Sequence, residues 1–227
     1  MDFKTFFGTD AGSIKKNCII CQAFDISLFS KKVSNGLFVK STTTKSATII
    51  ALKNNFLAGD TILRLKDSPC ENIFVFGSCG GYSQVTYGDL VIIDKAYNLE
   101  SFSDMLNFKK QVKYYRSSAG LLYCFHKKNI YEQLTLTNSA CVSSLYLEPK
   151  FLNWFSKREI YAIDMESSII LSASNSIKRK AICLMYVSDI VAPNTAMFLQ
   201  EEKSIKQKVS NSRKNLAEMI LRFCNEQ

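Results

Sequence analysis

Polar side chains that could do chemistry follow three apolar runs of the sequence, at the points where those runs end. They are Gly77-Ser78-Cys79-Gly80-Gly81, then Asp164-Met165-Glu166, then Ser188-Asp189. A glycine-rich turn at Ser78 and Gly80 can present N–H groups and a hydroxyl to an oxyanion, a sugar or a water. A carboxylate held among apolar walls accepts hydrogen bonds from hydroxyls such as those of a sugar diol. A partly buried aspartate with a raised pKa can act as a general acid near neutral pH.

Each of these segments also has an ordinary structural explanation. The glycine-rich turn can be purely structural, and Ser188-Asp189 can form a simple turn. Asp164 can cap the helix that follows it, with Glu166 favoured by the helix dipole. Two carboxylates between an apolar strand and an apolar helix are nevertheless costly to bury without partners. For Asp164 and Glu166 this cost favours a binding role.

The segments that carry these residues alternate between short β-rich apolar runs and longer stretches of helical period. This alternation predicts an α/β fold in which helices cover a sheet, and ligands bind such sheets where the strands end. The predicted strands are 18–24, 37–40, 72–76, 90–94, 134–142, 161–163 and 181–187, and the predicted helices are 45–56, 121–133, 149–156, 165–174 and 200–224.

The composition indicates one compactly folded domain. The chain has 227 residues, 47% of them hydrophobic, with 9 glycines and 3 prolines, which excludes disordered and collagen-like classes. No Gly/Ser/Pro-rich linker divides it, so we expect a single domain over 1–227, with 1–15 as a loosely ordered N-terminal extension.

The charge and the cysteines exclude several other classes. The formal charge of +9 comes from short, separated basic clusters rather than one block, so we expect neither a nucleic-acid nor a membrane partner. There is no apolar run of about 18 residues, which argues against a membrane span.

Cys18 and Cys21 have metal-site spacing but no second pair, so we expect no metal. Reduced, buried thiols predict a cytoplasmic protein.

Taken in order, the three segments together with Tyr87-Gly88-Asp89-Leu90-Val91-Ile92 resemble the nucleoside phosphorylase/nucleosidase superfamily. The resemblance spans about residues 18 to 224. It implies a three-layer α/β/α fold with a central mixed sheet, cleavage of the N-glycosidic bond of a nucleoside, no cofactor, and at least a homodimer. The aromatic residues Phe102, Phe108, Tyr114 and Tyr115, if exposed, would suit an interface between subunits.

The resemblance also implies roles for single residues. Met165 and Glu166 would pack on the ribose and bind its hydroxyls, Asp164 and Ser188 would belong to the same binding site, and Asp189 would protonate the departing purine. Tyr146 is the best match for an aromatic that stacks on the base; its alternative is a loop residue covering the core. Glu166 must stay ionised, because only a carboxylate accepts both ribose hydroxyls.

Enzymes of this family transfer the sugar either to water or to phosphate. Positions where this chain departs from the family pattern predict which of the two it uses. Similar phosphorylases carry an arginine just before the Gly-Ser segment, where this chain has Val75 and Phe76, and residues 40–45 lack the family's glycines. These departures favour water, and thus a purine nucleosidase acting on methylthioadenosine, S-adenosylhomocysteine or a futalosine-type compound. Asp25 is the candidate activator of that water, or else a turn cap. The alternatives are a phosphorylase that uses Lys45 or Arg64, and a non-catalytic nucleoside-binding protein.

Overall fold

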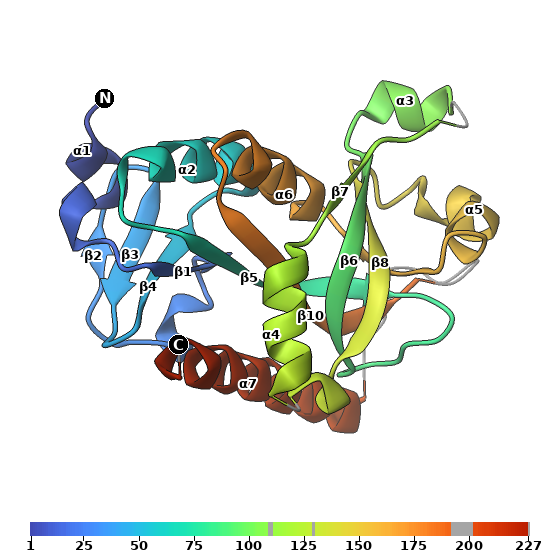
Figure 1. Ribbon diagram of the computed structural model, residues 1–227. Coiled ribbons are helices and arrows are strands. Elements are labelled where there is room, and N and C mark those ends of the chain that lie inside the picture. Colours follow the sequence, from blue (N-terminus) through green and yellow to red (C-terminus); the bar gives the residue numbers. More distant parts are fainter. Residues whose placement is uncertain (109–110, 129, 192–201, 227) are drawn as a thin grey trace.

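The computed structural model describes residues 1–108, 111–128, 130–191 and 202–226, and it has an α/β architecture built on one mixed sheet (Figure 1). The strands are β1 (Asn17–Gln22), β2 (Ser34–Asn35), β3 (Val39–Thr43), β4 (Ala47–Leu52), β5 (Asn72–Gly81), β6 (Leu90–Leu99), β7 (Tyr114–Arg116), β8 (Thr135–Val142), β9 (Ile160–Asp164) and β10 (Lys180–Ile190). The helices are α1 (Phe3–Phe7), α2 (Ala58–Arg64), α3 (Phe102–Leu106), α4 (Ala119–Lys127), α5 (Leu152–Ser156), α6 (Ser167–Ser176) and α7 (Lys203–Asn225).

The order of the strands brings the ends of β1, β5 and β10 to one edge of the sheet. The order is β10-β6-β8-β9-β5-β1-β4-β3-β2, and β10 also pairs with β5, so that β5, β9, β8, β6 and β10 form a closed ring. Both β1 and β10 run parallel to β5. The carboxyl ends of these three strands therefore lie at the same edge of the sheet. Ligands of α/β proteins bind at the carboxyl ends of the strands.

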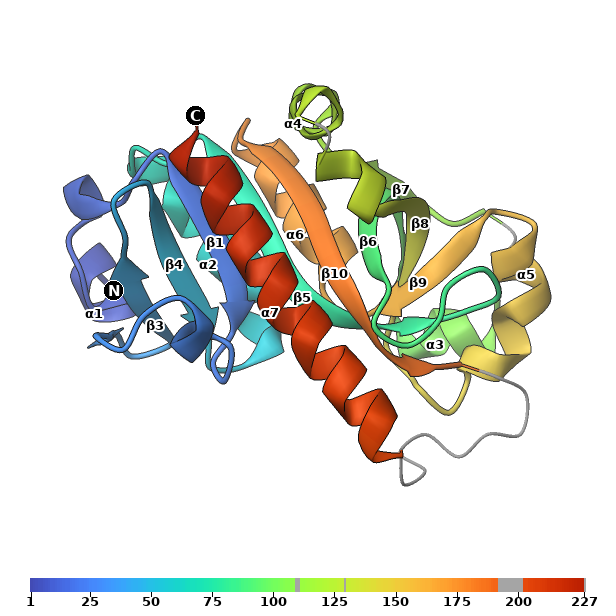
Figure 2. The same ribbon diagram turned by 90° about the horizontal axis from the view of Figure 1, so that it is seen from below.

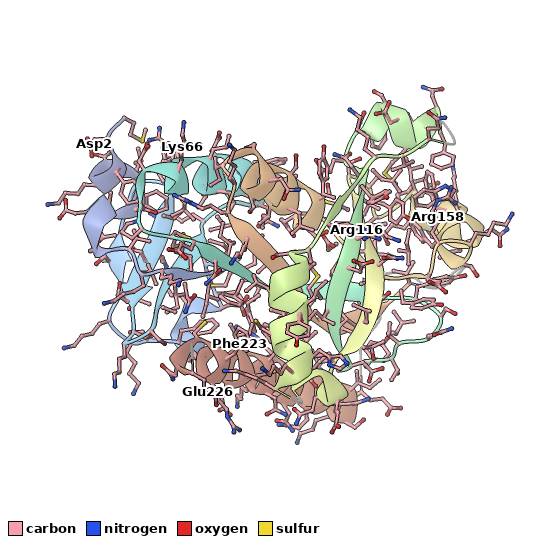
Figure 3. The ribbon with its side chains drawn as sticks, viewed as in Figure 1. Asp2, Lys66, Arg116, Arg158, Phe223 and Glu226 are labelled. Carbon is pink, nitrogen blue, oxygen red and sulfur yellow. The ribbon has the colours of Figure 1, made fainter. Side chains whose placement is uncertain are left out.

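Helices cover both faces of the sheet, as Figures 1 and 2 show. Buried side chains of α2 and α6 pack on one face, and those of α4 and α7 pack on the other. Phe223, near the C-terminal end of α7 (Figure 3), stacks on Phe125 of α4 with ring centroids 3.9 Å apart. The predicted three-layer α/β/α fold with a central mixed sheet is confirmed.

One predicted helix, 45–56, is wrong, because β4 (Ala47–Leu52) occupies most of it. Every residue of β4 is buried, and the strand lies between β1 and β3. A short apolar run that is buried on both faces has no alternation to distinguish a strand from a helix. Its β-branched residues Thr48, Ile49 and Ile50 were the signal that favoured a strand.

One further expectation differs from the structure. The segment from Gly77 to Gly81 is not a tight turn: β5 continues through it, held by β10 and β9, and none of its three glycines has a positive φ. Within the predicted N-terminal extension 1–15, α1 buries Phe6 and Phe7 in the core. Among the described residues, no helix is long and apolar enough to cross a membrane.

Candidate active site

A cavity of about 350 Å³ lies at the carboxyl ends of β1, β5, β9 and β10, and it brings the three sequence motifs together. The predicted site residues that line it are Ser78, Gly80, Asp164, Met165, Glu166, Ser188 and Asp189. Residues that the sequence did not mark also line it, among them Gln22, Phe24, Asn55, Leu145 and Glu148.

Asp189 reaches the cavity through an irregularity in β10. The pairing of β10 with β5 shifts register between Val187 and Asp189, and such bulges re-aim side chains. Ser188 Oγ donates a hydrogen bond of 2.6 Å to Asp189 Oδ1. A Cβ atom on Gly80 would stand only 3.2 Å from Asp189 Oδ2. The glycine therefore leaves room for the second carboxylate oxygen.

Gly77 has a different role in the same strand. It lines the cavity, and a Cβ atom placed on it would meet no heavy atom within 4 Å. The absence of a side chain therefore leaves open space beside Ser78. Because these glycines of β5 have no side chains, the backbone of the strand itself lines the cavity. This role does not require the strand to turn.

Asp164 and Glu166 have separate roles at the start of α6. Asp164 is buried; its Oδ1 accepts from the backbone N–H groups of Glu166 (2.9 Å) and Ser167 (2.7 Å), and its Oδ2 accepts from Ser167 Oγ (2.6 Å). Asp164 thus satisfies two backbone N–H groups at the start of α6, whose N-cap residue is Glu166. Glu166 accepts a hydrogen bond from Asn55 Nδ2. Asp164 holds the turn that presents Glu166 to the cavity.

The cavity is acidic, and burial changes how its carboxyl groups titrate. Burial, and then the charge of Asp164, raises the pKa of Glu166 to about 7. Burial, and then the charge of Asp189, raises the pKa of Glu148 to about 8. Burial also raises the pKa of Asp164, although its hydrogen bonds act in the opposite direction. Perturbed carboxyl groups gathered in a cleft are typical of a functional site.

The sequence profile of the phosphorylase superfamily matches residues 58–225, about three quarters of the chain. The chain belongs to the phosphorylase superfamily. The match includes the motifs from Gly77, Asp164 and Ser188 that line the cavity. Members of this superfamily are enzymes that act on nucleosides, as hydrolases or as phosphorylases.

Solved structures share the fold of this superfamily member at low sequence identity. Uridine phosphorylase from Vibrio fischeri superposes with a TM-score of 0.74 at 14% identity, covering 96% of this chain and 95% of that chain. The 5′-methylthioadenosine/S-adenosylhomocysteine nucleosidase of Campylobacter jejuni gives 0.70 at 14%, covering 95% and 100%. Futalosine hydrolase of Helicobacter pylori gives 0.69 at 11%, covering 94% and 99%. A comparison with curated protein sequences found no match.

Asp25, the predicted water activator, lies outside the cavity lining of this superfamily member. It is 1% exposed, and its Oδ1 accepts a 2.6 Å hydrogen bond from Arg213 Nε of α7. Arg213 also donates to the carbonyl oxygen of Phe24 at 3.2 Å. Burial raises the pKa of Asp25 although Arg213 acts in the opposite direction. These contacts assign Asp25 to an ion pair that joins α7 to the segment after β1.

Replacing Arg213 by methionine is expected to lower the free energy of unfolding by about 3 kcal/mol, because the buried Asp25 carboxylate loses its partner. Chemical denaturation measures this loss. The double variant Asp25→Asn/Arg213→Met should recover most of it, since both charges are then gone. If the ion pair is only structural, the folded variants keep the wild-type activity on nucleosides. Loss of activity at an unchanged free energy of unfolding would instead support the predicted role of Asp25 as the activator of the water.

Tyr146, the predicted stacking aromatic, also lies outside the lining. Its side chain is 87% exposed, whereas the neighbouring Leu145 lines the cavity. Two residues further along the loop, Glu148 is 2% exposed and lines the cavity as well. The loop after β8 therefore contributes an apolar and an acidic side chain. A glutamate directly before Pro149, between apolar residues, was the sequence signal for Glu148.

Proposed function

We propose that the protein is a nucleosidase that hydrolyses the N-glycosidic bond of a purine nucleoside. The observation that carries this proposal is the charge of the cavity. Its lining contains Glu148, Asp164, Glu166 and Asp189, whereas the described part of the chain contributes no lysine, arginine or histidine to it. Phosphate is an anion and would be repelled by such a lining, while a neutral water molecule would not.

The residues named for phosphate binding in a phosphorylase support the same choice. Val75 and Phe76, where similar phosphorylases carry arginine, are buried and apolar. Arg64 Nη1 donates a hydrogen bond of 3.0 Å to the carbonyl oxygen of Met1, and Arg64 Cζ lies 4.7 Å from the ring centroid of Phe6. Neither Lys45 nor Arg64 is part of the cavity lining. Phosphate would thus find only acidic and neutral groups there.

The reaction requires a proton at the base and support for the sugar. The bond between C1′ and the base nitrogen breaks, its electron pair leaves with the base, and Asp189 supplies the proton that neutralises the base. The hydroxyl of a water molecule bonds to C1′. Glu166, ionised, accepts hydrogen bonds from the ribose hydroxyls and supports the positive charge on the sugar. Its pKa of about 7 also suits it to take the water's other proton.

The proposed substrates are methylthioadenosine, S-adenosylhomocysteine and futalosine-type nucleosides. We propose that the enzyme acts as a homodimer in the cytoplasm. Structures of a methylthioadenosine/S-adenosylhomocysteine nucleosidase and a futalosine hydrolase are among those that share the fold. Of the four aromatics considered for an interface, Phe102 and Tyr114 are exposed, whereas Phe108 and Tyr115 pack against core clusters. Phe102 and Tyr114 are thus available to a partner subunit.

A panel of purine nucleosides, incubated with the protein in the presence and absence of phosphate and then chromatographed, tests the proposal. We expect base release from at least one member, at a rate that phosphate does not change. Base release that requires phosphate and yields the 1-phosphate of the substrate's sugar, ribose 1-phosphate for an unsubstituted nucleoside, would make the protein a phosphorylase. Tight binding without turnover, unchanged by Asp189→Asn, would make it a binding protein.

A further inference from the structure

Asn55 lines the cavity, and the proposed chemistry gives it no role. It begins the short 3₁₀ helix Asn55–Leu57 between β4 and α2. Its Nδ2 donates a hydrogen bond to Glu166 Oε1, although the two residues are 111 positions apart in the chain. A hydrogen bond to an ionised carboxylate is stronger than one between neutral groups. The contact therefore joins Asn55 to the residue that the proposed chemistry assigns to the sugar.

The packing of two helices brings Asn55 and Glu166 together. Asn55 precedes α2 and Glu166 precedes α6, and the two helices lie side by side on one face of the sheet (Figure 1). A Cβ atom placed on Gly59 of α2 would stand 3.1 Å from Ile169 Cγ2 of α6. Because glycine has no side chain, the helices can approach closely near the ends that carry Asn55 and Glu166. The fold itself thus builds this contact.

Two contacts hold Glu166 at two different points. Asp164 Oδ1 accepts a hydrogen bond of 2.9 Å from the backbone N–H of Glu166, which fixes the backbone. Asn55 binds one carboxylate oxygen of Glu166, which restricts rotation of the side chain. An ionised carboxylate has two oxygens with about four lone-pair sites between them, so Glu166 can still accept hydrogen bonds from the hydroxyls of a ligand.

A neutral amide suits this place in the cavity. The other charged groups that the described residues contribute to the lining are Glu148, Asp164 and Asp189, and all three are acidic. A lysine or arginine beside Glu166 would offset the negative charge that supports the sugar cation, and a further carboxylate would repel Glu166. An amide N–H holds the carboxylate and leaves its charge in place.

We propose that Asn55 is a positioning residue, which orients the Glu166 carboxylate toward the 2′ and 3′ hydroxyls of the substrate's ribose. This inference rests on the proposed function. Because Asn55 acts through Glu166, its removal should weaken those interactions with the ligand that Glu166 makes.

A double-variant cycle tests whether Asn55 acts through Glu166. Asn55→Leu, which removes the donor at a similar volume, should lower kcat/KM for the best nucleoside of the panel by about tenfold to a hundredfold. In the Glu166→Gln background the same change should have little further effect, because the charged acceptor is already gone. An equal loss in both backgrounds, or no loss in either, overturns the proposal.

Two aspartate variants separate the contact from a general effect of charge on this loop. Asn54 is exposed and lies outside the cavity lining, and its Oδ1 accepts a hydrogen bond of 3.0 Å from Phe56 N–H, which an aspartate can also accept. Asn54→Asp should therefore keep near wild-type kcat/KM. Asn55→Asp should lose at least as much as Asn55→Leu, since two carboxylates then face each other. A kcat/KM of Asn55→Asp as high as that of Asn54→Asp contradicts the proposal.

A binding measurement keeps this inference separate from the proposed function. If the wild-type protein releases no base from any nucleoside, the proposed function fails. Calorimetry with adenosine and 2′,3′-dideoxyadenosine then still tests Asn55, because the second ligand lacks both ribose hydroxyls. We expect the wild-type protein to bind adenosine more tightly, and folded Asn55→Leu to lose most of this difference. The same difference in both proteins, or equal affinities in the wild-type protein, overturns the inference.

Discussion

Replacing Asp189 by asparagine is expected to lower kcat/KM for base release by about 10²–10⁴-fold, the usual contribution of a general acid. Asparagine preserves the size of the side chain and can still donate a hydrogen bond to the base, but it cannot transfer a proton to it. The loss should appear mainly in kcat, because the protonation occurs in the transition state and not in the bound substrate. Steady-state kinetics on the best substrate of the panel measures it.

The matched control for this variant is Asp94→Asn on β6. Asp94 lies outside the cavity lining and forms ion pairs with Lys95 at 3.9 Å and Arg116 at 3.7 Å. Such partly exposed pairs contribute little, so the control should keep near wild-type activity. Equal activity of Asp189→Asn and the wild-type protein would remove Asp189 from the mechanism.

Replacing Glu166 by glutamine is expected to lower kcat/KM by about 10²–10³-fold, because the ribose hydroxyls lose a charged acceptor and the developing sugar cation loses its support. The wild-type pH profile should be bell-shaped. Glu166 acts in its ionised form, so activity rises with pH up to its pKa of about 7. Glu148 keeps its proton up to its pKa of about 8, and its ionisation above that pH adds a negative charge to the cavity, which disfavours the departure of an anionic base, so activity falls there.

The variant profile distinguishes this role from a structural one. Glu166→Gln should abolish the acid limb and leave the alkaline limb in place. Glu71→Gln, which alters an exposed pair with Lys16 at 3.3 Å, should keep both limbs. An acid limb that persists in Glu166→Gln with the same midpoint would assign that titration to another group.

The strand-end residues were predictable because a strand buried on both faces must end at an edge where polar residues can meet. Asp164 is the last residue of β9, Glu166 comes two residues later and Asp189 lies near the end of β10, and the structure brings them to one cavity. The glycines of β5 were recognised as part of the site, but their conformation was not. Whether a glycine-rich segment turns or continues as a strand depends on the neighbouring strands β9 and β10, which the local sequence does not specify.

Asp25, Tyr146 and Glu148 could not be placed from spacing alone. The partner of Asp25 is Arg213, which is 188 residues away, and no local pattern connects the two. Tyr146 and Glu148 both lie in the segment between β8 and α5, where a shift of one or two residues decides which side chain turns inward. The aromatic residue is the more conspicuous in the sequence, yet the structure exposes Tyr146 and buries Glu148.

We propose that water, and not phosphate, receives the sugar in the acidic cavity. Phosphorus NMR of a reaction that contains phosphate tests this directly, with the released base quantified in the same sample. We predict that base accumulates while the inorganic phosphate signal stays constant and no sugar phosphate appears. Formation of a sugar 1-phosphate that retains the 5′ substituent of the substrate, in an amount equal to the released base, would contradict the proposal.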